Sequence, residues 1–185
     1  MKILVSGGNA SGKSEYAENI AISLREKEQN LIYIATMKPY GDEAMERIER
    51  HHKLRETKGF ETIECYNELS ELVVPNDSVI LLECLSNLMA NELFPDKDNN
   101  GMDENGYYAV LGGVEHLEKE AEHLVVVTNN IFSDGIKYDS YSVKYQKYLA
   151  QTNRILAARF DELIEVVCGR PLYHKREAEI LNAGV

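Results

Sequence analysis

The sequence has few cysteines, a deficit of basic residues and no long apolar run. Its three cysteines, Cys65, Cys84 and Cys168, lie far apart without histidines at zinc-like intervals, so we expect buried, reduced thiols. Lys and Arg number 20 against 31 Asp and Glu, and the formal net charge of -11 argues against non-specific nucleic-acid binding. No segment is long and apolar enough to span a bilayer, and the first apolar run begins too early to leave room for a signal peptide. We therefore expect a cytoplasmic protein.

Length and composition predict one domain. The chain has 185 residues, of which 44% are hydrophobic and 28% are charged, the ordinary usage of a soluble globular protein. No repeat, low-complexity tract or linker divides it. We expect a single domain over residues 1–185, which ends in an extension after about residue 170.

The glycine-rich segment at residues 7–14 is the most informative feature. It reads GGNASGKS, the G-x-x-x-x-G-K-S pattern of a phosphate-binding P-loop, and it follows the apolar run Ile3-Leu4-Val5. Backbone N–H groups and the positive end of the next helix would bind the phosphates of a nucleoside triphosphate. The predicted nucleotide-binding residues of the loop are Gly7, Gly8, Asn9, Ala10, Ser11, Gly12, Lys13 and Ser14.

Two side chains of this loop have specific predicted roles. Lys13 would reach the β and γ phosphates, and Ser14 would place its hydroxyl on Mg²⁺. We expect Lys13 to lie on the solvent side, outside the core. The alternative is a glycine-rich turn that reads GKS by chance. The preceding strand and the following amphipathic helix, with Ala17, Ala21 and Leu24 on one face, argue against that alternative.

Apolar strands and amphipathic helices alternate along the rest of the chain. The predicted strands cover residues 31–35, 79–82, 124–127 and 163–168. The predicted helices cover about residues 42–57, 85–93, 110–121 and 141–160, and a polar loop covers residues 95–105. Continuous apolar strands separated by helices indicate a sheet buried on both faces. The predicted fold is α/β, a P-loop NTPase-like three-layer fold with a mostly parallel sheet.

Polar residues follow the predicted strands, at the sheet edge where ligands bind in such folds. Besides the P-loop they lie at residues 36–38, 83–84, 128–130 and 169–170. Glu83 ends the apolar run at 79–82, where P-loop proteins keep an acidic residue that holds Mg²⁺ directly or through water. The alternative is a solvated carboxylate at a strand end. We favour the metal-binding interpretation, because a charge next to a fully apolar run must find either solvent or a metal.

Two adjacent histidines, His51 and His52, stand in the charged helical stretch. Neighbouring residues of a helix point about 100° apart, so at most one of the two can face a given site. Taken alone, the pair is more typical of an exposed polar face. A neutral imidazole near a triphosphate could instead attack phosphorus and form a phosphoramidate.

The order of these motifs resembles a known family. Along the chain stand GGNASGKS at 7–14, YIAT at 33–36, Arg47-Ile48, His51-His52-Lys53, TIE at 62–64, LECL at 82–85 with Asn91 and Leu93, and VTN at 127–129. From Met1 to about Cys168 this order is similar to the bifunctional adenosylcobinamide kinase/adenosylcobinamide-phosphate guanylyltransferase family of cobalamin biosynthesis. The P-loop alone is common to many kinases, whereas the combination is much more specific.

The resemblance implies two reactions on one scaffold. A nucleoside triphosphate phosphorylates the hydroxyl of adenosylcobinamide, and GTP then donates GMP to that phosphate through a guanylylated histidine, for which the first of the pair, His51, is the match. It also implies GTP and ATP as substrates, Mg²⁺, a corrinoid acceptor and a homotrimer. Outside the P-loop, the nucleotide-binding segments of the family match Thr36, Met37, Lys38, His52, Lys53, Leu54, Arg55, Glu64 and Glu83.

The chain departs from the family pattern in two regions. Glu56 and Thr57 occupy the places of an Arg-Pro pair, with Arg55 one position early, and Phe60 replaces a tryptophan. Asn130 lacks the acidic group usual after VTN. Further on, Gln146-Lys147 replaces an Arg-Asp pair and Ala150 a glycine. The second region leaves the guanylyl-transfer residues more intact than those of the acceptor or kinase region.

Two other functions remain compatible with the sequence. One is a P-loop kinase of another small metabolite, in which the histidines are surface residues. The other is a regulator on the same scaffold that binds GTP without turnover. Covalent labelling by the α-phosphate of GTP would distinguish them, because γ-phosphoryl transfer leaves no nucleotide on the protein.

Overall fold

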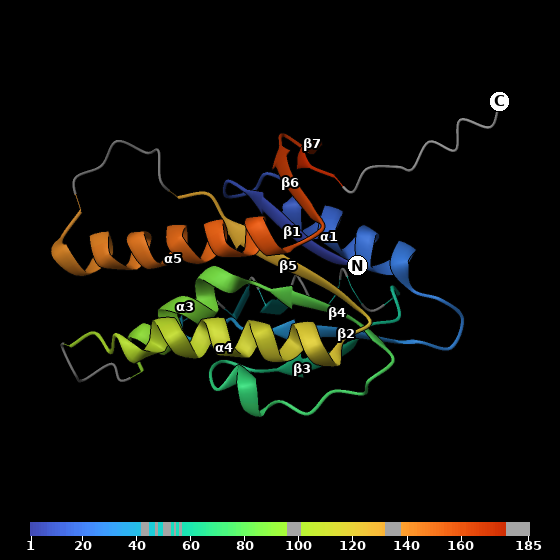
Figure 1. The fold of residues 1–185 in the computed structure, drawn as a ribbon, viewed down its shortest axis with the longest axis horizontal. Helices are drawn as coiled ribbons and strands as arrows, with labels where there is room; N and C mark the ends of the chain where they lie inside the picture. The colour runs from blue at the N-terminus through green and yellow to red at the C-terminus, as the bar shows by residue number, and fades with distance from the viewer. Residues whose placement is uncertain are drawn as a thin grey trace.

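The apolar runs near residues 3, 31, 79 and 124 become the central strands of one sheet, which helices cover on both faces (Figure 1). The computed structural model describes residues 1–41, 45–46, 48–49, 53, 55, 57–95, 101–131 and 138–176. The strands are β1 (Lys2–Gly7), β2 (Asn30–Ala35), β3 (Glu61–Glu64), β4 (Ser78–Glu83), β5 (His123–Asn129), β6 (Glu162–Val167) and β7 (Arg170–Lys175). The helices are α1 (Lys13–Leu24), α3 (Leu85–Leu93), α4 (Asn105–Glu120) and α5 (Ser140–Arg159), with a short 3-10 helix, η1 (Leu69–Glu71).

The strands follow the order β3-β2-β4-β5-β1-β6-β7. All neighbours are parallel except β6 and β7, which form an antiparallel hairpin. In the centre, Val5 of β1 lies opposite Val127 of β5, and Leu82 of β4 lies opposite Val126. The predicted α/β fold with a mostly parallel sheet is confirmed, and the P-loop lies at the carboxyl end of β1.

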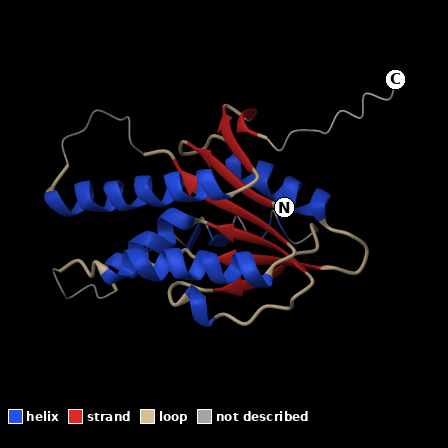
Figure 2. Ribbon diagram, viewed as in Figure 1, coloured by secondary structure: helices blue, strands red, loops and turns tan. Residues whose placement is uncertain are grey.

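Alternating side chains of the strands build two cores, one on each face of the sheet. Leu4, Leu82 and Val126 belong to the core covered by α3, α4 and α5. Val5 and Val127 belong to the core covered by α1. Figure 2 shows the first three-helix layer in front of the strands and α1 on the other side. The central strands contain continuous apolar runs because both of their faces are covered.

The two edge strands are absent from the sequence prediction. β3 is the short segment ETIE, and β7 begins with an Arg-Pro pair after the predicted last strand has ended. β7 therefore places residues 170–175, the first part of the expected extension, inside the sheet. Its Lys175 Nζ donates to the carbonyl of Ala158, 3.1 Å away, near the end of α5. Edge strands pair on one side only, and such mixed polar sequences are common there.

The helices agree closely with the prediction where they are described. α5 begins after Asp139, whose Oδ1 accepts from the backbone N–H groups of Tyr141 at 2.9 Å and Ser142 at 3.1 Å. In the charged stretch predicted as a helix, the described residues Met45, Glu46, Ile48, Glu49, Lys53 and Arg55 are helical. None of the helices that the structure describes is long and apolar enough to cross a membrane.

The prediction of three buried thiols is wrong for two of the cysteines. All three are free thiols, but only Cys84 is buried, at the end of β4. Cys65 is half-buried just after β3, and Cys168 is exposed in the turn between β6 and β7. Both lie beside the edge strands that the sequence analysis did not identify, where one flank of the sheet is open.

Candidate functional site

The P-loop joins β1 to α1, and two of its glycines are required by geometry. A side chain at Gly7 would approach within 2.7 Å of the carbonyl oxygen of Val166 in β6. Gly12 has a φ of 90°, a left-handed conformation that glycine adopts without strain. The turn after β6 supports the loop, because the N–H of Gly169 donates to the carbonyl of Ser11 at 2.8 Å. The loop is therefore held from three sides by β1, α1 and the β6–β7 turn.

Lys13 is buried, which differs from the expected position on the solvent side. Only 8% of the residue is exposed, and its Nζ donates to the carbonyl of Gly8 at 2.9 Å. The loop folds over the side chain, so that its own carbonyl holds the ammonium group. The ammonium is thus positioned inside the loop that would receive a phosphate.

Ser14 and Glu83 meet at the end of β4, as the sequence analysis expects. The Ser14 hydroxyl donates to Glu83 Oε1 at 2.5 Å. The other oxygen, Oε2, is buried and has no hydrogen-bond partner among the described residues. Burial raises the pKa of Glu83 to about 7, against the opposing effects of the Ser14 hydrogen bond and the Lys13 charge. The burial of Oε2 argues against the alternative of a solvated carboxylate.

Thr36 holds the backbone that carries Glu83. Its hydroxyl accepts from the N–H of Cys84 and donates to the carbonyl of Cys84, both at 2.8 Å. Its own N–H donates to the carbonyl of Glu83 at 3.0 Å. Asn91 Nδ2 in turn donates to the carbonyls of Thr36 and Tyr66, each at 2.8 Å. Thr36 is fully buried, so the structure gives it a positioning role toward Glu83.

Replacing Thr36 by valine should test this role. Thr36→Val keeps the shape but leaves the buried N–H of Cys84 unpaired, while the Cys84 carbonyl keeps its bond from the Leu88 N–H at 3.2 Å. We therefore expect a loss of about 1–3 kcal/mol in the free energy of unfolding. Urea denaturation measures that change. Thr36→Ser keeps the hydroxyl and should recover most of the stability. Equal stability of the valine variant and the wild type would show that the hydroxyl does not support the strand end.

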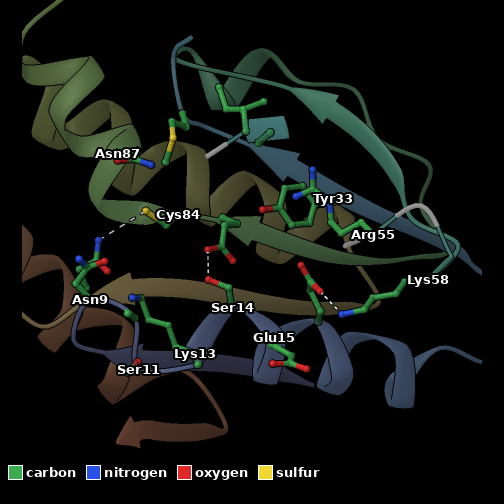
Figure 3. Close-up of a pocket in the computed structure, with 18 of the residues that line it drawn as sticks. Asn9, Ser11, Lys13, Ser14, Glu15, Tyr33, Arg55, Lys58, Cys84 and Asn87 are labelled. Carbon is green, nitrogen blue, oxygen red and sulfur yellow. Dashed lines mark hydrogen bonds and ion pairs between the residues drawn. The ribbon is translucent and has the colours of Figure 1, made fainter. Parts of the chain in front are cut away.

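A cavity of about 520 Å³ extends from the P-loop along α1 (Figure 3). Figure 3 shows Lys13 and Ser14 near one end of it, and Tyr33 with Arg55 at the other. Arg55 is 5% exposed, and the carbon of its guanidinium lies 3.4 Å from the centre of the Tyr33 ring. Its Nε and Nη1 are buried without a hydrogen-bond partner in the described part of the chain. The cavity thus combines an ammonium at one end with a guanidinium at the other, a suitable arrangement for a polyanion.

Several residues of this cavity are absent from the predicted nucleotide-binding residues, although two of them, Cys84 and Asn129, follow predicted strands at the expected ligand-binding edge. They are Glu15, Glu18, Tyr33, Ala35, Ile48, Lys58, Tyr66, Cys84, Asn87 and Asn129. Lys58 Nζ lies 2.5 Å from Glu18 Oε2 in a largely buried ion pair. Glu18 stands one helical turn after Ser14, so helical spacing could have identified it. Tyr33 and Lys58 carry no such signal, because the fold brings them to α1 from other elements.

The remaining predicted residues fall into three groups. The cavity is lined by six of them: Asn9, Ala10, Ser11, Gly12, Met37 and Glu64. Lys38 is not among the residues that line it, and Lys53 forms an exposed ion pair with Glu49 at 2.7 Å. His51, His52 and Leu54 lie outside the described residues, so their predicted roles are not tested. Within the described part, no three His, Cys, Asp or Glu side chains are grouped to hold a metal ion.

The sequence and the fold of this chain are similar to those of known proteins. The sequence model of the family described as cobinamide kinase / cobinamide phosphate guanyltransferase matches residues 3–173. The bifunctional adenosylcobalamin biosynthesis protein CobU of Salmonella typhimurium is 30% identical over 180 residues, which cover 91% of this chain and 97% of that protein. The protein of the same name from Escherichia coli is 29% identical over the same shares. The crystal structure of the flagellar accessory protein FlaH from Methanocaldococcus jannaschii has a TM-score of 0.47 and 13% identity, covering 95% of this chain and 78% of that one.

Proposed function

Because this chain belongs to the cobinamide kinase / cobinamide phosphate guanyltransferase family, we propose that it phosphorylates adenosylcobinamide and then transfers GMP from GTP to the resulting phosphate. The main structural support for the proposal is the hydrogen bond between Ser14 and Glu83 beside the buried ammonium of Lys13. These three groups are the ones that P-loop enzymes use on a triphosphate. The proposal places the protein in cobalamin biosynthesis, in the cytoplasm and as a homotrimer.

The kinase step needs a positioned cation at the terminal phosphate. The acceptor hydroxyl oxygen forms a bond to the γ-phosphorus, and the bond from that phosphorus to the β–γ bridging oxygen breaks. The nucleoside diphosphate leaves, and the hydroxyl proton passes to water. Lys13 stabilises the charge on the β and γ oxygens during this transfer.

The guanylyl transfer proceeds in two displacements at the α-phosphorus. A ring nitrogen of His51 bonds to this phosphorus, the bond to the α–β bridging oxygen breaks, and pyrophosphate leaves. An oxygen of adenosylcobinamide phosphate then attacks the same phosphorus, and the P–N bond breaks to release the histidine. Buried cations at both ends of the cavity, Lys13 and Arg55, support the binding of the triphosphate for this step.

Ser14 and Glu83 would hold Mg²⁺. The fit is supported by the buried Oε2 of Glu83, which lacks a partner among the described residues, and by the adjacent Ser14 hydroxyl. Two oxygen donors suit a hard cation that keeps several waters and binds phosphate oxygens. When bound, the ion neutralises charge on the transferred phosphate group.

Glu83→Gln should lower the catalytic rate without destabilising the nucleotide-free protein. We expect a fall of about 10²- to 10³-fold in the Mg²⁺-dependent rate, with a smaller loss of nucleotide affinity, because charge neutralisation matters most in the transition state. In the wild type, the rate should fall as the pH drops below about 7, where Glu83 becomes protonated and cannot bind a cation. A rate profile against pH and Mg²⁺ concentration measures both effects.

The same substitution should stabilise the nucleotide-free protein at alkaline pH. The folded-state pKa of Glu83, about 7, is above its ordinary value of 4.5, so the fold binds this proton more tightly than the unfolded chain does. The resulting stability is present below pH 4.5 and is lost as the pH rises through 7. Glutamine is neutral throughout, so Glu83→Gln should raise Tm at pH 8 but much less at pH 5. Glu115→Gln, in an exposed pair with Lys119, is the matched control and should not show this pattern.

Incubation with GTP labelled at the α-phosphorus tests the proposed function. Intact-protein mass measurement should detect one added GMP with Mg²⁺ present, and adenosylcobinamide phosphate should remove it. Turnover that transfers only the γ-phosphate would favour the simple kinase. Bound GTP with neither label nor turnover would favour the non-catalytic regulator.

A further inference from the structure

The cavity beside the P-loop has an ion pair in its wall that the chemistry proposed above does not use. Lys58 Nζ lies 2.5 Å from Glu18 Oε2, and the two side chains are 23% and 4% exposed. Both residues line the cavity. Figure 3 shows Lys58 at the same end of it as Tyr33 and Arg55. The Glu18–Lys58 pair therefore faces the part of the cavity that the phosphate-binding groups leave open.

Fixed backbone presents both members of the Glu18–Lys58 pair. Glu18 belongs to α1 and stands one helical turn, about 5.4 Å, beyond Ser14. Lys58 follows the charged segment, and its backbone N–H donates to the carbonyl of Arg55 at 2.8 Å. The relative position of the carboxylate and the ammonium is thus set by the fold before any ligand binds.

The pair has unused hydrogen-bonding capacity. An ammonium has three donors and a carboxylate has two acceptor oxygens, yet the contact between Lys58 and Glu18 is the only hydrogen bond of either side chain within the described residues. Glu18 Oε1 has no partner there and is not fully buried, so it remains open to the cavity. Because charges removed from water need further hydrogen bonds to offset their desolvation, this arrangement suits a polar ligand.

The base of a bound nucleotide would reach the pair. Lys13 and Ser14 would hold the β and γ phosphates and their cation at one end of the cavity. The cavity of about 520 Å³ continues from there along α1. Ala35, Met37 and Ile48 also line it and offer apolar contacts to the flat faces of a base. The edge of that base would then meet the Glu18–Lys58 pair.

Guanine complements this pair better than adenine does. The edge of guanine has a carbonyl oxygen at position 6, followed by N–H donors at positions 1 and 2. An ammonium beside a carboxylate offers the matching order of one donor followed by two acceptors. Adenine has an amino group at position 6 and an acceptor nitrogen at position 1, so in the same orientation each would face a group of its own kind. Such a mismatch is costly because it leaves buried polar groups unpaired.

We infer that Glu18 and Lys58 are the residues that select guanine in this cavity. Glu18 accepts from N1–H and from the 2-amino group, and Lys58 donates to the oxygen at position 6. The inference rests on the proposed function for the identity of the nucleotide. The P-loop contacts only phosphates, which all nucleoside triphosphates share, so the choice of GTP as the guanylyl donor depends on this pair.

Titration of the wild type with purine nucleoside monophosphates tests the inference without any substitution. These compounds have no leaving group on the α-phosphorus, so no covalent label forms during the measurement. GMP should bind about tenfold more tightly than IMP, which lacks the 2-amino group. Both should bind more tightly than AMP. Isothermal titration calorimetry measures the affinities, and equal affinities for GMP and AMP would overturn the inference.

Glu18→Gln should change the preferred base. The amide keeps one acceptor for N1–H and replaces the other by an N–H donor, which suits the carbonyl at position 2 of xanthine. We expect the GMP affinity to fall by about tenfold or more and the XMP affinity to rise by a similar factor. A purely structural role of the pair would instead lower all the affinities by one common factor. Glu104→Gln, in an exposed ion pair with Lys144 at 2.7 Å, is the control and should change none of them.

Lys58→Met removes the donor to position 6 and provides an independent variant. GMP and IMP share this oxygen, so their affinities should fall by the same factor, whereas the AMP affinity should not fall. A Glu18→Gln protein that still prefers GMP to XMP, or loses affinity for every monophosphate equally, would contradict the inference.

Labelling with GTP separates this inference from the proposed function. A wild type that acquires the GMP label but binds GMP and AMP equally would overturn only the role of the Glu18–Lys58 pair. A wild type that neither acquires the label nor binds any of these purine nucleotides would overturn both.

Discussion

His51→Ala should carry no guanylyl label after incubation with GTP and Mg²⁺, while the wild type carries one GMP. Removing the proposed nucleophile eliminates the covalent intermediate rather than slowing its formation, so the expected loss is complete. The label in the wild type should be stable in base and labile in acid, as a P–N bond is. Intact-protein mass spectrometry at both pH extremes measures the label.

The neighbouring histidine provides the matched control. His52→Ala should keep part of the label, because the family resemblance assigns the nucleophile to the first of the pair. Both variants should phosphorylate adenosylcobinamide, since the proposed kinase step uses Lys13 and not the histidine. Label that persists in His51→Ala would assign the nucleophile elsewhere, and a wild type without any label would leave the simple kinase as the better description.

Lys13→Ala should lower the rate of both reactions by about 10²- to 10³-fold, the usual effect of removing one preorganised charge from a phosphoryl-transfer site. It should also weaken triphosphate binding, because the ammonium held against Gly8 has no substitute in the loop sequence. The Lys13 charge lowers the pKa of Glu83, so its loss should also move the pH dependence of the residual Mg²⁺-dependent rate to higher pH. Steady-state kinetics over a pH series measures all three effects.

The control for this variant is a lysine of the same chain outside the site. Lys119→Ala removes an exposed ion pair with Glu115 and should leave the kinetics unchanged. Because Lys13 is buried, the thermal unfolding of both variants should be measured together with the kinetics. A folded Lys13→Ala protein with wild-type affinity and rate would contradict the P-loop assignment.

Local sequence patterns were sufficient to predict the central fold and one end of the site. The loop at residues 7–14 has a fixed spacing, and Glu83 ends a run of four apolar residues, so both could be identified without knowledge of any long-range contact. β3 and β7 could not, because edge strands bury little and their sequences do not show a continuous apolar run.

Residues that act through distant partners could not be predicted from local patterns. Thr36 is separated from Cys84 by 48 positions, and only the pairing of β2 with β4 brings its hydroxyl to that backbone. Arg55 stands in a charged segment that suggests exposure, yet it is buried against Tyr33 of a neighbouring strand. The family resemblance named both residues as nucleotide-binding, and the structure adds the partners that each one contacts.

The order of the strands affects when a nascent chain can acquire its ligand. β1 is the strand nearest the start of the sequence, yet it lies between β5 and β6, with Lys2 opposite Leu124 and Ile3 opposite Glu162. During synthesis the P-loop emerges early, but its contact with Gly169 cannot form until the final hairpin has emerged. Closing such distant pairs is slow relative to local helix formation. We therefore expect nucleotide to stabilise chains that include this hairpin more than shorter chains, in which the P-loop lacks the Gly169 contact.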